Sequence, residues 1–167
     1  MPKWWPFQKE NPNAAENAAF DQAEANLRNQ IKEQQAQGTS AQAILREIEA
    51  QTQALEKAEQ TVDVKGKLRA LDLVYSELHP RLLNNVSQGK VLEMAGQIAQ
   101  ACEYYEKAVQ DQIATRFPYE HLRVIYRREG KFAQALRICQ LATQNPFLSD
   151  KDRAHFQQWA EKLAPAG

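Results

Sequence analysis

Glycine, cysteine, net charge and long apolar runs are all scarce or missing in this 167-residue sequence. Only six glycines occur, whereas Ala, Gln, Glu and Leu are abundant, which favours helix over strand. Cys102 and Cys139 form no CxxC motif, so we expect buried free thiols in a reducing compartment. Because no apolar run matches an export signal or a membrane span, we expect a cytoplasmic protein.

Formal net charge is zero, with 21 basic and 21 acidic residues, which argues against a nucleic-acid-binding protein. The two signs are nevertheless segregated along the chain. Residues 16–60 carry eight Asp/Glu against four Lys/Arg, whereas residues 116–137 carry six Lys/Arg against two Glu. A weak nucleic-acid contact through residues 116–137 therefore stays open as a minor alternative.

Motifs for catalysis and for metal binding are also missing. His79, His121 and His155 have no HExxH, HxH or neighbouring cysteine, and neither a glycine-rich phosphate loop nor GxSxG occurs. We therefore expect no cofactor, no metal site and no enzymatic activity.

Residues 1–13 are predicted to form a flexible head, because three prolines in this stretch disfavour helix. Its KWWPF run places Trp4, Trp5 and Phe7 on a segment where exposed aromatic surface is costly. We interpret the run as a candidate docking motif, whose acceptor is this chain's own domain, a membrane interface or a partner protein.

Residues 14–62 are rich in Ala and Gln, and apolar residues recur every three or four positions over about 14–37 and 41–61. Gly38 between these stretches favours a helix end. The segment is predicted to be an antiparallel helical hairpin or a short coiled coil. Its acidic helices allow an alternative function, structural self-association into a homo-oligomer.

A third helix is predicted over about 64–79, with Asp63 as its N-terminal cap. Pro80 is expected to end this helix, because the residue before a proline is disfavoured in helical geometry.

The sequence repeats itself beyond residue 82, where GQIAQACEYYEKAV aligns with GKFAQALRICQLAT. The related pairs are Gly96 with Gly130, Ala101 with Ala135, and Ala108 with Ala142. Glycine suits a tight turn between two helices, and alanine allows the helices to approach closely. This repeat spacing therefore predicts two helical hairpins of the same design.

The pattern resembles the tetratricopeptide repeat family, whose period of about 34 residues it shares. Gly89 and Tyr105 agree with the family's preferences, whereas Asn85, Arg123 and Cys139 depart from its usual Trp, Gly and aromatic residue. The departures leave a degenerate array of two to three repeats, and whether residues 41–80 form a third repeat stays open.

The resemblance implies an all-α fold of antiparallel helical hairpins stacked as a short solenoid, with an N-terminal helical extension. The repeat domain would span residues 63–164. Ser149 and Asp152 favour a last helix over about 150–163, whose apolar face would cap the stack.

In that family, the first helix of each repeat lines a concave groove. The corresponding positions here are Lys90, Glu93, Met94, Val124, Arg127 and Arg128. Guanidinium groups suit a carboxylate-bearing peptide. Val86 and Val124 replace the polar residues of the chaperone-binding subclass, so a chaperone tail is not expected. The resemblance implies a non-enzymatic adaptor or scaffold that binds a protein or peptide, with an acidic one as the first candidate.

Overall fold

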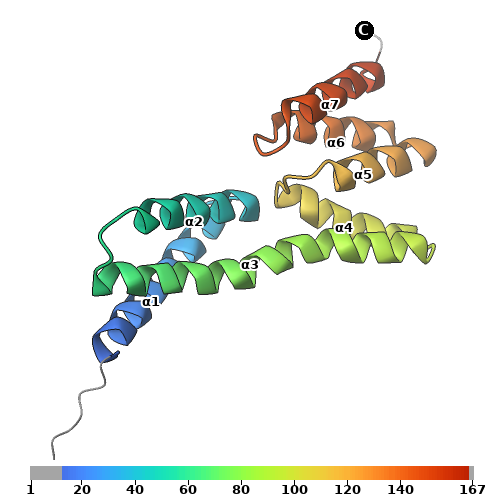
Figure 1. The fold of residues 1–167 in the computed structure, drawn as a ribbon. Helices are drawn as coiled ribbons and strands as arrows, with labels where there is room; N and C mark the ends of the chain where they lie inside the picture. The colour runs from blue at the N-terminus through green and yellow to red at the C-terminus, as the bar shows by residue number, and fades with distance from the viewer. Residues whose placement is uncertain (1–12, 166–167) are drawn as a thin grey trace, which may run out of the picture.

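The computed structural model describes residues 13–165. All regular secondary structure in that range is α-helical, which confirms the predicted fold class. Figure 1 shows α1 and α2 beside the N-terminal half of a long α3, with the later helices stacked beyond its C-terminal half. Trp4, Trp5 and Phe7 of the predicted head lie outside the described residues. The helices are α1 Ala14–Ala36, α2 Ala41–Glu56, α3 Val62–Met94, α4 Ile98–Gln110, α5 Phe117–Arg128, α6 Phe132–Gln144 and α7 Asp150–Leu163.

Helix α1 packs mainly on α3 and contacts α2 little, so α1 and α2 do not form the predicted separate hairpin or coiled coil. The crossing of α1 and α3 is close, because a Cβ added to Gly66 would lie 2.7 Å from the Ala19 Cβ. Leu27 and Ile31 bury the apolar stripe of α1 against Leu71 and its neighbours. The apolar stripe of α1 is therefore covered mainly by α3, and Ile44 and Ile48 of α2 complete the same cluster.

Helix α2 begins after Ser40, whose Oγ accepts a hydrogen bond from the Ala43 amide at 3.2 Å. It ends at Glu56, which is earlier than predicted. The predicted Asp63 cap is also wrong, since Thr61 Oγ1 accepts from the Val64 amide and α3 begins at Val62. Threonine is a good N-cap residue, and Asp63 remains in the first turn, where a negative charge is favourable.

Helix α3 runs for 33 residues through Pro80, so the prediction that Pro80 ends a helix is wrong. An interior proline costs about 3 kcal/mol because it removes a backbone donor. Burial on both sides of the proline offsets this cost, with Val74 before it only 2% exposed and Leu82 after it only 4% exposed. The predicted domain boundary between residues 62 and 63 falls within the first turn of this continuous helix.

The second half of α3 forms a hairpin with α4, and α5 forms a second hairpin with α6. Gly96 and Gly130 make the two turns with φ of +77° and +72°, which confirms the predicted role of both glycines. The alanines related by the repeat spacing are fully buried, namely Ala101, Ala108, Ala135 and Ala142. Close helix contact through small residues is thus the shared design of both hairpins.

Helix α7 forms close to the predicted bounds and packs on α6. Ser149 Oγ accepts a hydrogen bond from the Asp152 amide at 3.1 Å and caps the helix. Phe156 is fully buried on its inner face.

Candidate partner-binding face

The second half of α3, α5 and α7 are linked in this order by side-chain contacts. Side chains on each helix contact side chains on the next. Glu93 of α3 meets His121 of α5, while Glu120 of α5 meets His155 of α7. We call the surface made by these three helices the first-helix face, because α3 and α5 are the first helices of the two hairpins and α7 continues their row.

Two buried positions behind this face differ in residue size between the two hairpins. A Cβ added to Gly89 would lie 2.4 Å from the Tyr105 ring, so α3 and α4 interlock as small against large. The residues at the corresponding positions of the next hairpin are the large Arg123 and the small Cys139, and both are buried. The order of large and small residues is thus reversed between the two hairpins, and the Arg123 guanidinium lies against Trp159 of α7.

The six sequence-predicted groove residues lie on α3 and α5 with different exposures. Lys90, Met94, Arg127 and Arg128 are exposed, and Met94 reaches 81%. Glu93 and Val124 are half-buried. None of Lys90, Arg127 and Arg128 forms an ion pair with any residue from 13 to 165. The three cations therefore carry charge that the described part of the chain leaves uncompensated by direct contact.

Glu93 is already engaged within the protein. Its Oε2 accepts a hydrogen bond from the Tyr105 hydroxyl at 2.7 Å and lies 2.6 Å from His121 Nδ1. The imidazole of His121 stacks on Phe117 with ring centroids 4.0 Å apart. The Lys90 ammonium lies 5.8 Å from the centre of the Phe117 ring. This end of the face is thus a linked cluster that joins α3 to α5, with Lys90 at its surface.

A second linked cluster joins α5 to α7 around Glu120. Its carboxylate accepts from the Arg123 guanidinium and lies 3.0 Å from His155 Nε2. Burial by itself would raise the pKa of Glu120, but the hydrogen bonds from Arg123 and His155 outweigh burial and hold this pKa below its usual value. Arg116 approaches Asp152 at 3.8 Å on the same side. Glu120 is therefore an ionised anchor between two helices.

Trp159 of α7 completes this second cluster. The Arg123 guanidinium lies 3.9 Å from the centre of the Trp159 ring, and that of Arg127 lies 5.1 Å away. The Lys162 ammonium lies 4.9 Å from the same centre. Arg123 is 4% exposed, and its Nη1 has no hydrogen-bond partner among residues 13–165.

Sequence reasoning missed several of the residues that the structure brings to this face, namely Phe117, Glu120, His121, His155 and Trp159. Two signals in the sequence could have found them. Phe117 and His121 precede Val124 by about two turns and one turn of helix, so they share its side of α5. His121 and His155 are themselves separated by the repeat spacing, which places α7 in register with the first helices of the hairpins.

The chain was compared with protein-family models, with curated proteins and with solved structures. None of these comparisons finds a match.

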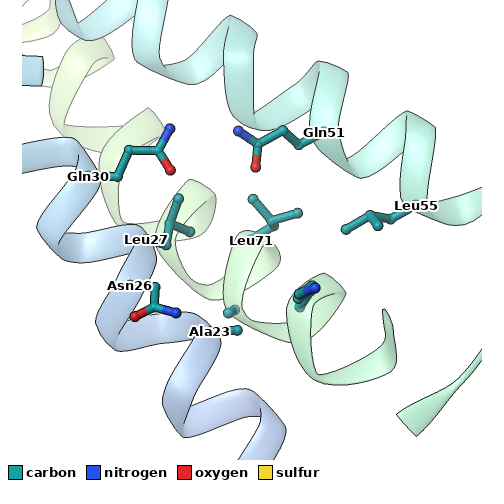
Figure 2. A pocket seen from close by; sticks show the side chains of 9 residues that line it. Ala23, Asn26, Leu27, Gln30, Gln51, Leu55 and Leu71 are labelled. Carbon is teal, nitrogen blue, oxygen red and sulfur yellow. The ribbon is translucent and has the colours of Figure 1, made fainter. Parts of the chain in front are cut away.

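A separate pocket of about 180 Å³ opens between α1, α2 and α3 (Figure 2). Leu27, Leu55 and Leu71 line it, and the amides of Asn26, Gln30 and Gln51 are among its other lining residues. Lys67 is the one titratable side chain among its lining residues. The pocket therefore offers apolar contact and amide hydrogen bonds and carries no acid–base pair for chemistry.

Metal-binding clusters and membrane-spanning helices are both absent between residues 13 and 165. Within this range, no three His, Cys, Asp or Glu side chains come together in a way that could hold a metal ion. No helix there is long and apolar enough to cross a membrane.

Proposed function

We propose that this chain is a non-enzymatic interaction module that holds a protein or peptide against the first-helix face of a tetratricopeptide-like stack. The observation that carries the proposal is the alignment of α3, α5 and α7 with exposed, unpaired cations on two of them. Lys90 of α3 and Arg127 and Arg128 of α5 present charge outward. A partner that brings carboxylates to these groups would compensate that charge.

The rest of the face supports the same proposal, because it is held rigid without a partner. Glu93 and Glu120 fix α3 to α5 and α5 to α7 through short contacts with His121 and His155. A preorganised surface loses little conformational entropy on binding. A partner would therefore meet a surface that is already formed.

A cytoplasmic location belongs to the same proposal. Cys102 and Cys139 are free thiols. Burial, as the largest cause, raises the pKa of each thiol to about 11, so both are protonated at neutral pH. Protonated, partly or fully buried thiols are compatible with a reducing compartment.

Comparative affinity capture tests the proposed function with three baits. They are the intact chain, the double variant Arg127→Glu/Arg128→Glu and the double variant Lys32→Glu/Lys65→Glu. Lys32 and Lys65 are exposed on α1 and the start of α3, and neither is among the ion-paired residues, so the charge change is matched away from the face. Thermal unfolding of each bait verifies that all three are folded.

We expect the intact chain and the Lys32→Glu/Lys65→Glu control to retain the same amount of a partner. The Arg127→Glu/Arg128→Glu variant should retain at least about tenfold less of it. A tenfold loss corresponds to about 1.4 kcal/mol, which two reversed contacts readily supply. Equal retention by all three folded baits would remove the first-helix face as the binding surface.

A further inference from the structure

We propose that the cations around Trp159 form a receptor for side-chain carboxylates of an acidic peptide, so that α7 contributes to binding as well as capping the stack. This inference rests on the proposed function and names the chemistry of its partner. The proposed receptor consists of Arg123 and Arg127 from α5 with Trp159 and Lys162 from α7, and we call it the Trp159 cluster.

Positively charged groups converge on Trp159. Three cationic groups lie within 3.9–5.1 Å of one indole centre. Arg123 is paired with Glu120, so the uncompensated charges beside the ring are those of Arg127 and Lys162. A cation–π contact at an exposed site is only weakly attractive. An added anion would therefore lower the energy of the cluster by compensating these two charges.

The Trp159 cluster contains more cationic groups than paired carboxylates. Glu120 pairs with Arg123, whereas Arg127 and Lys162 pair with no carboxylate among residues 13–165. Arg123 is more than nine-tenths buried, and its Nη1 lacks a hydrogen-bond acceptor. The exposed cations of the cluster that no carboxylate within residues 13–165 offsets are therefore Arg127 and Lys162, which both lie beside Trp159 and point to a carboxylate supplied from outside.

Acidic residues near the cluster favour the carboxylates of a peptide over a nucleic acid. The same two helices also carry carboxylates that contact basic residues, with Glu120 paired to Arg123 and Asp152 lying 3.8 Å from Arg116. A continuous polyphosphate backbone would meet these carboxylates and be repelled by them. One or two separate carboxylates of a peptide can reach the cations and avoid the acidic groups, and a guanidinium binds a carboxylate bidentately.

Trp159 fluorescence provides a direct test in the full chain with Trp4→Phe and Trp5→Phe, which leaves Trp159 as the single tryptophan. The probe is a synthetic peptide of three consecutive glutamates flanked by Gly-Ser at both ends. The comparison ligands are the same peptide with three glutamines and a short oligothymidylate. The test variant is Arg127→Gln/Lys162→Gln, and the matched control is Lys32→Gln/Lys65→Gln.

We expect a saturable change in Trp159 emission with the glutamate peptide, and affinity that falls as salt is raised. Affinity should fall at least about tenfold in Arg127→Gln/Lys162→Gln and stay within about twofold in the control. Thermal unfolding is recorded for both variants, so that loss of binding is separated from loss of folding.

Three outcomes would overturn the inference. No saturable change at millimolar peptide would do so, as would equal affinity for the glutamine peptide or equal affinity in Arg127→Gln/Lys162→Gln. Tighter binding of oligothymidylate would replace the peptide with a nucleic acid. In each case the proposed function stands if Arg127→Glu/Arg128→Glu still loses its captured partner, so the two failures are distinguishable.

Discussion

The two hairpins place large and small residues in opposite order at two buried positions. Gly89 faces the large Tyr105 ring, whereas Arg123 and the small Cys139 occupy the corresponding positions of the next hairpin. Read singly, Arg123 and Cys139 look like departures from the repeat. The close contact of Gly89 with Tyr105 and that of Arg123 with Trp159 could not be predicted from the sequence, because both depend on which helices lie beside each other.

Substituting Gly89 by alanine tests this packing. In a helix interior, glycine to alanine normally stabilises by about 1 kcal/mol. Here the added Cβ would overlap the Tyr105 ring, so we expect Gly89→Ala to lower the free energy of unfolding by about 1–2 kcal/mol in chemical denaturation. Ser87→Ala, at an exposed position of α3, should change it by less than about 0.5 kcal/mol. A more stable Gly89→Ala protein would contradict the close contact.

At the scale of the element, the helix ends at Gly96 and Gly130 were predicted correctly from the sequence. The helix end predicted at Pro80 was wrong. Gly96 and Gly130 have positive φ, which is a local requirement that local sequence reveals. The continuation of α3 through Pro80 depends on Val74 and Leu82, which are buried by helices distant in the sequence. Propensity alone predicted a helix end there because it omits that burial.

The turn at Gly130 supplies a prediction about backbone strain. Apart from its chain neighbours, no residue in the described part of the chain has an atom within 4 Å of a Cβ added there, so a substitution meets mainly the strain of the left-handed backbone. We expect Gly130→Ala to lower the free energy of unfolding by about 1 kcal/mol, and Gly130→Asn to lower it less, since asparagine tolerates this conformation. Equal unfolding midpoints for all three proteins would show that the turn does not require a positive φ.

The contact between α5 and α7 predicts a dependence of stability on pH. Because the folded-state pKa of Glu120 is lowered, its stabilising contribution is complete above its unfolded value of 4.5 and is lost as pH falls below that value. Glu120→Gln should cost about 1–3 kcal/mol at neutral pH, since it leaves the buried Arg123 without its carboxylate. Thermal melts between pH 3 and 7 measure both effects. An unchanged acid-induced loss of stability in the variant would argue against this contact.

At the scale of the whole molecule, α2 and α3 join regions that the sequence predicted as separate domains. Leu45 belongs to the core of the hairpin stack, whereas its neighbour Ile44 belongs to the core beneath α1. Gln42 of α2 also accepts a hydrogen bond through Oε1 from the Ala114 amide at 3.1 Å, in the connection before α5. Because these links join positions that are far apart along the chain, no local pattern could reveal them.

This coupling predicts one cooperative unfolding transition. Ile44→Ala should lower the free energy of unfolding by about 2–4 kcal/mol, because Ile44 is 1% exposed. In the background with Trp4→Phe and Trp5→Phe, the loss of helical circular dichroism and the change in Trp159 fluorescence should shift together. An early step in circular dichroism that leaves Trp159 fluorescence unchanged would show that the two regions unfold independently.

The candidate site was predictable only in part. The repeat register identified Lys90, Arg127 and Arg128 as surface positions on first helices, and the structure exposes all three. It did not identify the partners of Glu93, or the approach of Trp159 to Arg127, because both arise from contacts between helices. A repeat pattern fixes which side of a helix a residue occupies, whereas neighbouring helices determine whether that residue is free.

Mapping a captured partner by amide chemical-shift changes in the ¹⁵N-labelled chain tests the central claim most directly. We predict that the changes concentrate on the second half of α3, on α5 and on α7, with Arg127, Arg128 and the indole of Trp159 among the most affected. Changes confined to α4 and α6, or to the region of α1 and α2, would contradict the claim that the first-helix face holds the partner.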